Sequence, residues 1–114
     1  MDTRRGIETF AALAAHHGVE WMPSGSSRFG ADALRVNGKI FAALTRKHRL
    51  LLKLPPPRVA QLLAEGRAER FASGGRVMNG WITLTPQQAS EWMPLADEAR
   101  AFVAAETRRK PRKR

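Results

Sequence analysis

The sequence predicts a two-layer α+β domain, in which helices pack on an antiparallel sheet in the order α-β-β-β-α-β-β-α. Two observations carry this prediction. Three short apolar runs lie between residues 32 and 54, and Asn37-Gly38 between the first two is typical of a tight β-hairpin turn. The segments on either side of these runs repeat apolar residues at helical spacing. The length of 114 residues suits a single domain.

The first half of the chain is predicted to form one helix and three strands. Apolar side chains recur at intervals of three and four over residues 3–17, and Gly18 ends this helix. Asn37-Gly38 tolerates the positive φ of a type I′ turn and therefore joins the first two strands. The predicted strands cover residues 32–36, 39–44 and 49–54.

The second half is predicted to form a helix, a strand pair and a last helix. A proline triplet at 55–57 ends the third strand, because proline donates no ladder hydrogen bond, and it favours the first turn of a helix at 56–65. Thr85, Pro86 and Gln88 are typical of a helix start. The predicted strand pair covers residues 68–71 and 77–84. The last helix is predicted to carry a buried stripe of Trp92, Leu95, Ala96, Ala99, Phe102 and Val103.

Strand alternation predicts two different faces for the first three strands. We take 37–38 as a two-residue turn and 45–48 as a four-residue loop, so that Phe41 pairs with Leu52. The predicted core face holds Leu34, Val36, Phe41, Leu50, Leu52 and Leu54. The opposite face, called the reverse face below, is predicted to hold Arg35, Arg49 and Lys53 among Ile40, Ala42, Leu44 and Leu51.

Three interpretations of the reverse face stay open at this point. It is a strip covered by the chain's own loops or termini, a surface for homodimerisation, or a surface that contacts nucleic acid. We place no aromatic residue on this face. The side of Trp81 stays open, because it alternates with Ile82 and either residue suits the core.

Positive charge is concentrated at the C-terminus. The net charge is +10, and six of the cations lie in the last seven residues. Without those six, 14 basic and 10 acidic residues leave +4 for residues 1–107. We therefore predict a folded domain at 1–106 and a disordered basic tail at 107–114, which attracts phosphates by counterion release or acts only as a solvated terminus. The cations are Arg108, Arg109, Lys110, Arg112, Lys113 and Arg114.

Candidate catalytic and metal-binding residues are few. The chain has no cysteine, which excludes thiol catalysis, disulfides and thiolate metal sites. His16 and His17 are neighbours, so a helix points them about 100° apart and we expect no joint metal binding. His48 lies among cations, and the serines of residues 24–27 lack a His and Asp arrangement. We expect no enzyme, no cofactor and no metal.

Nothing in the sequence predicts a membrane or secretory destination. No apolar run approaches the roughly 18–20 residues that a bilayer requires, and no signal peptide is evident. We therefore expect a cytoplasmic protein.

The pattern of glycines and apolar residues resembles that of a known family. It runs through residues 28–44 and 51–55, then through Gly66 to Phe71, Gly75 to Met78, Trp81 and the helix at 91–103. Over residues 7–104 the chain resembles the TfoX/Sxy N-terminal domain and, more loosely, the MmcQ/YjbR proteins. The resemblance implies a two-layer α+β fold without a catalytic residue set, a link to competence regulation and, for some relatives, DNA binding.

The expected function is that of a non-enzymatic accessory or regulatory module. It contacts DNA or RNA without sequence specificity, through the tail together with Arg35, Arg49 and Lys53. The alternative is a protein–protein interaction module that homodimerises through the open sheet face and has no nucleic-acid role.

Overall fold

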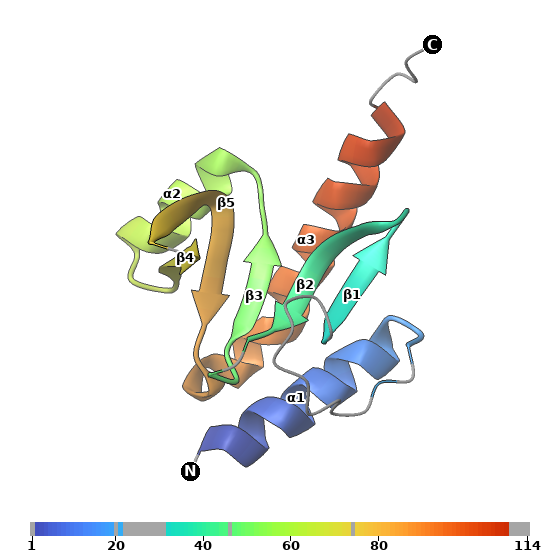
Figure 1. Cartoon of the computed structure of the whole chain (residues 1–114), viewed down its shortest axis with the longest axis vertical. Coiled ribbons are helices and arrows are strands. Elements are labelled where there is room, and N and C mark those ends of the chain that lie inside the picture. The colour runs from blue at the N-terminus through green and yellow to red at the C-terminus, as the bar shows by residue number, and fades with distance from the viewer. Residues whose placement is uncertain (1, 20, 22–31, 46, 74, 110–114) are drawn as a thin grey trace.

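The predicted fold class and element order are confirmed by a computed structural model, which describes residues 2–19, 21, 32–45, 47–73 and 75–109 (Figure 1). The five strands form one antiparallel open sheet in the order β1-β2-β3-β5-β4. The helices and strands are α1 (Asp2–His16), β1 (Ala33–Val36), β2 (Lys39–Leu44), β3 (Leu50–Lys53), α2 (Pro56–Ala64), β4 (Glu69–Ser73), β5 (Arg76–Leu84), the 3-10 turn η1 (Pro86–Gln88) and α3 (Ala89–Arg109).

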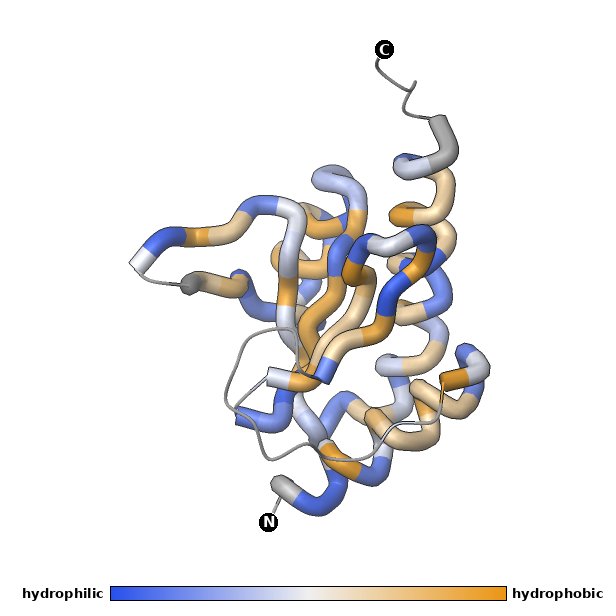
Figure 2. Tube along the Cα trace, turned by 45° about the vertical axis from the view of Figure 1, so that its right-hand side comes forward, coloured by the Kyte–Doolittle hydropathy of each residue, from blue (hydrophilic) through white to orange (hydrophobic). Residues whose placement is uncertain are grey.

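The helices form the second layer of the domain. α2 and α3 lie behind the sheet in Figure 1, and α1 crosses below it and packs against α3. Apolar residues are concentrated on the strands in the middle of the molecule (Figure 2). Among the helices of the described chain, none is both long and apolar enough to cross a membrane.

The core is built from the apolar stripe predicted on α3. Trp92 is fully buried, and its indole Nε1 donates a hydrogen bond of 3.0 Å to the carbonyl oxygen of Thr85. Burial of apolar surface stabilises the fold by about 25 cal/mol per Å². Phe102 is the exception to the predicted stripe, because it packs at the margin of the core and stays partly exposed. The buried members of the stripe are Trp92, Leu95, Ala96, Ala99 and Val103.

The predicted pairing of β1 with β2 fails at one residue, Phe41. Arg35 lies opposite Ile40 as expected, but Leu34 lies opposite Ala42, so Phe41 is an extra residue in β2. Such a bulge turns two successive side chains toward one face and shifts the pairing of everything that follows. Phe41 and Ala42 accordingly both lie in the core.

The bulge in the β1–β2 pair, together with a β2–β3 loop that is longer than predicted, changes the membership of the two faces. Ala42 pairs with Leu52, and Ala43 instead of Ala42 pairs with Leu51. The placement of Ala42 and Leu44 on the reverse face was therefore wrong, because Ala42 is a core residue and Leu44 packs against the core. All six residues predicted on the core face are buried in the core as expected: Leu34, Val36, Phe41, Leu50, Leu52 and Leu54.

The loop between β2 and β3 is one residue longer than predicted. The main-chain N–H of Arg49 donates to the hydroxyl of Thr45 at 3.1 Å, and the N–H of Thr45 donates to the carbonyl of Arg49 at 2.9 Å. His48 reaches the closing geometry with a φ of 62°. These bonds keep Arg49 in the loop, so β3 begins at Leu50.

The last helix begins as predicted and ends later. Gln88 Oε1 accepts the main-chain N–H of Thr85 at 2.8 Å, which satisfies a donor at the helix start. α3 then continues to Arg109, so residues 107–109 of the expected tail are helical, and residues 110–114 lie outside the described residues. The Asn37 Nδ2 donates to the Thr107 hydroxyl at 2.8 Å, which joins the β1–β2 turn to the end of α3.

Gly6 in α1 provides a test of this packing. A Cβ at Gly6 would lie 2.7 Å from the carbonyl oxygen of His48, which is main chain and cannot rotate away. A helical Gly→Ala change normally stabilises by about 1 kcal/mol. We expect Gly6→Ala to destabilise by about 1–3 kcal/mol, because α1 must shift away from the β2–β3 loop. Urea unfolding measures this free energy, and a more stable variant would contradict the contact.

Candidate nucleic-acid interface

The three cations predicted on the sheet share one face by register. Arg49 directly precedes β3 and alternates with Leu51 and Lys53, so the three side chains point the same way. Leu51 lies opposite Ala43, which follows Ile40 beyond the bulge, and Ile40 lies opposite Arg35. Arg35 therefore also belongs to the reverse face.

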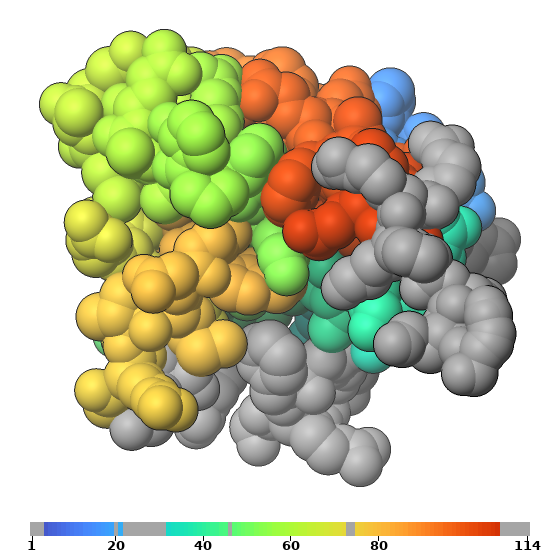
Figure 3. Space-filling model, turned by 90° about the horizontal axis from the view of Figure 1, so that it is seen from above, coloured from blue at the N-terminus to red at the C-terminus, as the bar shows by residue number. Residues whose placement is uncertain are grey.

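Arg35 and Lys53 lie close to one end of the sheet, called the open end below. The β1–β2 turn at 37–38, Lys53 at the end of β3 and Glu106 and Thr107 near the end of α3 meet there. Figure 3 looks onto this end, with α2 and α3 beside the strands. Arg108 follows Thr107 directly, so the basic segment 108–114 begins at the open end. The sheet cations and the basic segment, which are far apart in the sequence, therefore meet at the open end.

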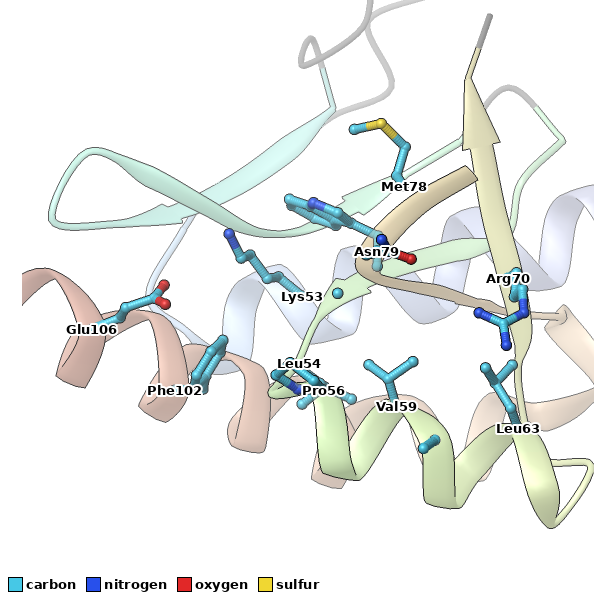
Figure 4. Close-up of a pocket in the computed structure, with 13 residues that line it drawn as sticks. Lys53, Leu54, Pro56, Val59, Leu63, Arg70, Met78, Asn79, Phe102 and Glu106 are labelled. Atoms are coloured by element: carbon cyan, nitrogen blue, oxygen red, sulfur yellow. The ribbon is translucent and has the colours of Figure 1, made fainter. Parts of the chain in front are cut away.

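Two adjoining hollows lie at the open end, with volumes of about 500 and 470 Å³. They share Lys53, Trp81 and Glu106. The larger hollow extends between β5 and the helices, where Val59 of α2 and Phe102 of α3 face it (Figure 4). The smaller one reaches Arg35 and Lys39 on the hairpin. Cations therefore line the strand side, and Glu106 places one carboxylate on the helix side.

Trp81 is a site residue that the sequence analysis left unplaced. It lies directly opposite Lys53, and the Lys53 Nζ is 5.7 Å from the centroid of the indole ring. Such a cation–π contact contributes about 0.5–1 kcal/mol at a partly exposed position. The expectation that the reverse face lacks an aromatic residue is therefore wrong. The sequence held no signal that decides this, because Ile82 and Trp81 both suit the core; in the structure Ile82 is completely buried, which sends its neighbour Trp81 to the other side.

The cations of this region differ in whether a carboxylate neutralises them. Arg49 donates a hydrogen bond of 2.7 Å to Glu69 across β5, so its charge is already compensated. The charge of Arg67 is compensated as well, because its guanidinium donates hydrogen bonds to Glu65 and Glu91. These bonds also raise the pKa of the guanidinium. Within the described part of the chain, four cations that line the hollows have no ion-pair partner: Arg35, Lys39, Lys53 and Arg70. Their charges are the ones available to an anionic ligand.

The apolar part of the reverse face is largely covered within the chain. Leu51 is 1% exposed and Ala43 is 4% exposed. Ile40 is only half-buried and borders the smaller hollow. The face therefore offers little apolar area to a second copy, and homodimerisation stays a prediction from the sequence.

The histidine pair differs from its prediction. The Nε2 atoms of His16 and His17 lie 3.2 and 3.3 Å from the same atom, Oδ1 of Asp97 on α3. The expected divergence of the two rings is wrong, because a 100° step separates the Cα–Cβ directions while the side-chain torsions turn both rings toward one carboxylate. Burial lowers the pKa of His17, Asp97 opposes that shift, and His16 and Arg100 add to it.

His48 lies apart in the β2–β3 loop, and the serines of residues 24–27 lie outside the described residues.

The candidate interface therefore combines four cations without an ion-pair partner in the described chain, one aromatic ring and the start of the basic segment. The structure places Arg35 and Lys53 together at the open end, whereas Arg49 lies at the other end of β3. Arg108 and Arg109 end α3, and Lys110, Arg112, Lys113 and Arg114 are outside the described residues. Comparison of the chain with protein-family models, with curated proteins and with solved structures finds no match in any of the three.

Proposed function

We propose that the chain binds nucleic acid without sequence specificity, as an accessory or regulatory module, through the open end and the basic segment 108–114. The observation that carries the proposal is the position of Arg35 and Lys53. Both are unpaired within the described structure, and they lie beside Trp81 where the basic segment begins. A polyanion bound to the sheet cations of the open end would lie near the point where the basic segment begins.

The electrostatic contribution comes from cations that no carboxylate of the described chain compensates. Each phosphate contact releases condensed counterions, so binding weakens as salt rises. Glu106 repels anions from the helix side of the hollows. Phosphates are therefore expected along Arg35 and Lys53, on the strand side of the hollows and away from Glu106.

Trp81 adds a contribution that favours single strands. Every base has a flat face that stacks on an aromatic ring, and each such contact contributes about 1–3 kcal/mol. Bases of a duplex are already stacked on each other and do not reach the indole. We therefore expect binding to single strands to depend on Trp81 and binding to duplexes to depend on charge alone.

The proposal includes no base-specific recognition and no reaction. Phosphate contacts position a nucleic acid without reading its sequence. The resemblance to TfoX/Sxy N-terminal domains and MmcQ/YjbR proteins agrees with the same proposal, since some of those relatives carry a DNA-binding label, and membership of that family is part of what we propose.

The first prediction concerns Arg35 and Lys53, two of the unpaired sheet cations. Replacing both, as Arg35→Gln with Lys53→Gln, removes two phosphate contacts, so the log–log salt slope for a single strand becomes about 1.4 units shallower. Fluorescence anisotropy of a labelled oligothymidylate at several salt concentrations measures this slope. The matched control is Arg5→Gln with Lys47→Gln, which removes the same charge where the start of α1 meets the β2–β3 loop. Equal slopes for the two double variants would count against the open end.

The second prediction concerns the indole ring. Trp81→Ala is expected to weaken single-strand binding by about 5- to 150-fold, because one stacked base loses its platform. Trp81→Phe keeps an aromatic face and is expected to stay within a few-fold of the wild type. Duplex binding is measured in parallel and should not change. Equal losses for Ala and Phe, with both variants folded by circular dichroism, would remove the stacking role.

The third prediction concerns the basic segment. Substituting glutamine for its six cations keeps the length of α3, which a truncation at Thr107 would shorten. If all six contact phosphates, the duplex salt slope becomes shallower by about 5 units. Unchanged duplex affinity across the salt range would show that the segment makes no contact.

A further inference from the structure

The strongest further feature is the convergence of His16, His17 and Asp97 on one point between α1 and α3. The Nε2 atoms of the two histidines lie 3.2 and 3.3 Å from Asp97 Oδ1, and the potential ligand atoms of the three residues all lie within 4.8 Å of one another. Zinc bonds to nitrogen and oxygen of about 2.0–2.1 Å place tetrahedral ligands about 3.3 Å apart. The two distances to Asp97 already match this spacing.

A second observation points to a ligand at this position. The His17 side chain is only 8% exposed, and its Nε2 is buried without a hydrogen-bond partner among the described residues. Although His17 Nε2 lies 3.3 Å from Asp97 Oδ1, the angle between the two groups does not allow a hydrogen bond. A buried polar atom without a partner in a native structure calls for an explanation. A metal ion accepts a lone pair from such a nitrogen and would satisfy it.

The surroundings hold the rings in place and leave room for a further ligand. His17 packs edge-on against Phe41, with ring centroids 5.2 Å apart, and against His16 at 4.9 Å. The His16 and Asp97 side chains are 46% and 50% exposed, so water reaches the cluster and supplies a fourth ligand. α1 ends at His16, and a cation is favoured at the negative end of the helix dipole.

Positive charge opposes the binding of a cation here, both locally and over the whole chain. The chemistry of the ligand atoms decides which metal is favoured. Arg100 lies close enough to act on His17, and the whole chain carries +10. Imidazole nitrogens select zinc and similar transition metals, whereas magnesium and calcium prefer oxygen ligands. We propose that His16, His17 and Asp97 bind one zinc ion, with water as the fourth ligand, and that the ion fastens the end of α1 to α3.

This inference departs from the expectation of no metal and is independent of nucleic-acid binding. Neither hollow of the open end includes any of the three residues. The two proposals therefore succeed or fail separately.

The test uses the full chain without a polyhistidine tag, freed of metal by a chelator. Isothermal titration with zinc chloride is expected to show one site. At a hundredfold excess over the dissociation constant, zinc should raise the melting temperature by about 11 °C, because the ion binds the folded state. Magnesium chloride at the same concentration should have no effect.

Variants assign the site to its residues. His16→Ala and Asp97→Asn change half-exposed side chains, so both proteins should fold and both should lose the zinc-induced shift. The matched control is His48→Asn, which removes the histidine of the β2–β3 loop and suits the positive φ there. This control should keep the full shift. An absent shift in the wild type, or equal shifts in all four proteins, would overturn the proposal.

Discussion

The register of the first three strands is the constraint on which the arrangement of this domain depends. A single extra residue at Phe41 turns Phe41 and Ala42 together into the core and sends Ala43 to the opposite side. Because side chains alternate with a period of two, this bulge places the core residue Ala42 of β2 opposite the core residue Leu52 of β3. It leaves Arg35, Arg49 and Lys53 on the same face, while Leu34, Phe41 and Leu52 remain in the core beneath the helices.

Features set by local chemistry were predictable from the sequence. Asn37-Gly38 closes the hairpin and Thr85 with Gln88 starts the last helix, because turns and caps depend on residues a few positions apart. The bulge, the side of Trp81 and the meeting of His16 with Asp97 were not predictable, since each depends on elements distant in the sequence. The length of α3 was missed for the same reason, because a contact between Asn37 and Thr107 joins its last turns to the hairpin.

α3 links the two proposed binding regions of the molecule. Asp97 faces the histidines at the end of α1, and Thr107, ten residues later, reaches the β1–β2 turn. At 1.5 Å per residue these positions are about 15 Å apart along the helix. The same helix buries Trp92, Ala99 and Val103 against the sheet. Both regions are therefore positioned by one rigid element, and each is completed by a different partner from the first half of the chain.

The two register irregularities also affect how the domain behaves at high concentration. One lies in the pair β1–β2 and the other in the pair β4–β5, which are the two outermost pairs of the open sheet. A straight edge strand exposes a row of main-chain groups that recruits further strands and seeds aggregates. Here β1 has only four residues, β4 carries Glu69 and Arg70, and both outer ladders are distorted. Lateral growth of the sheet into fibrils is consequently disfavoured at either border.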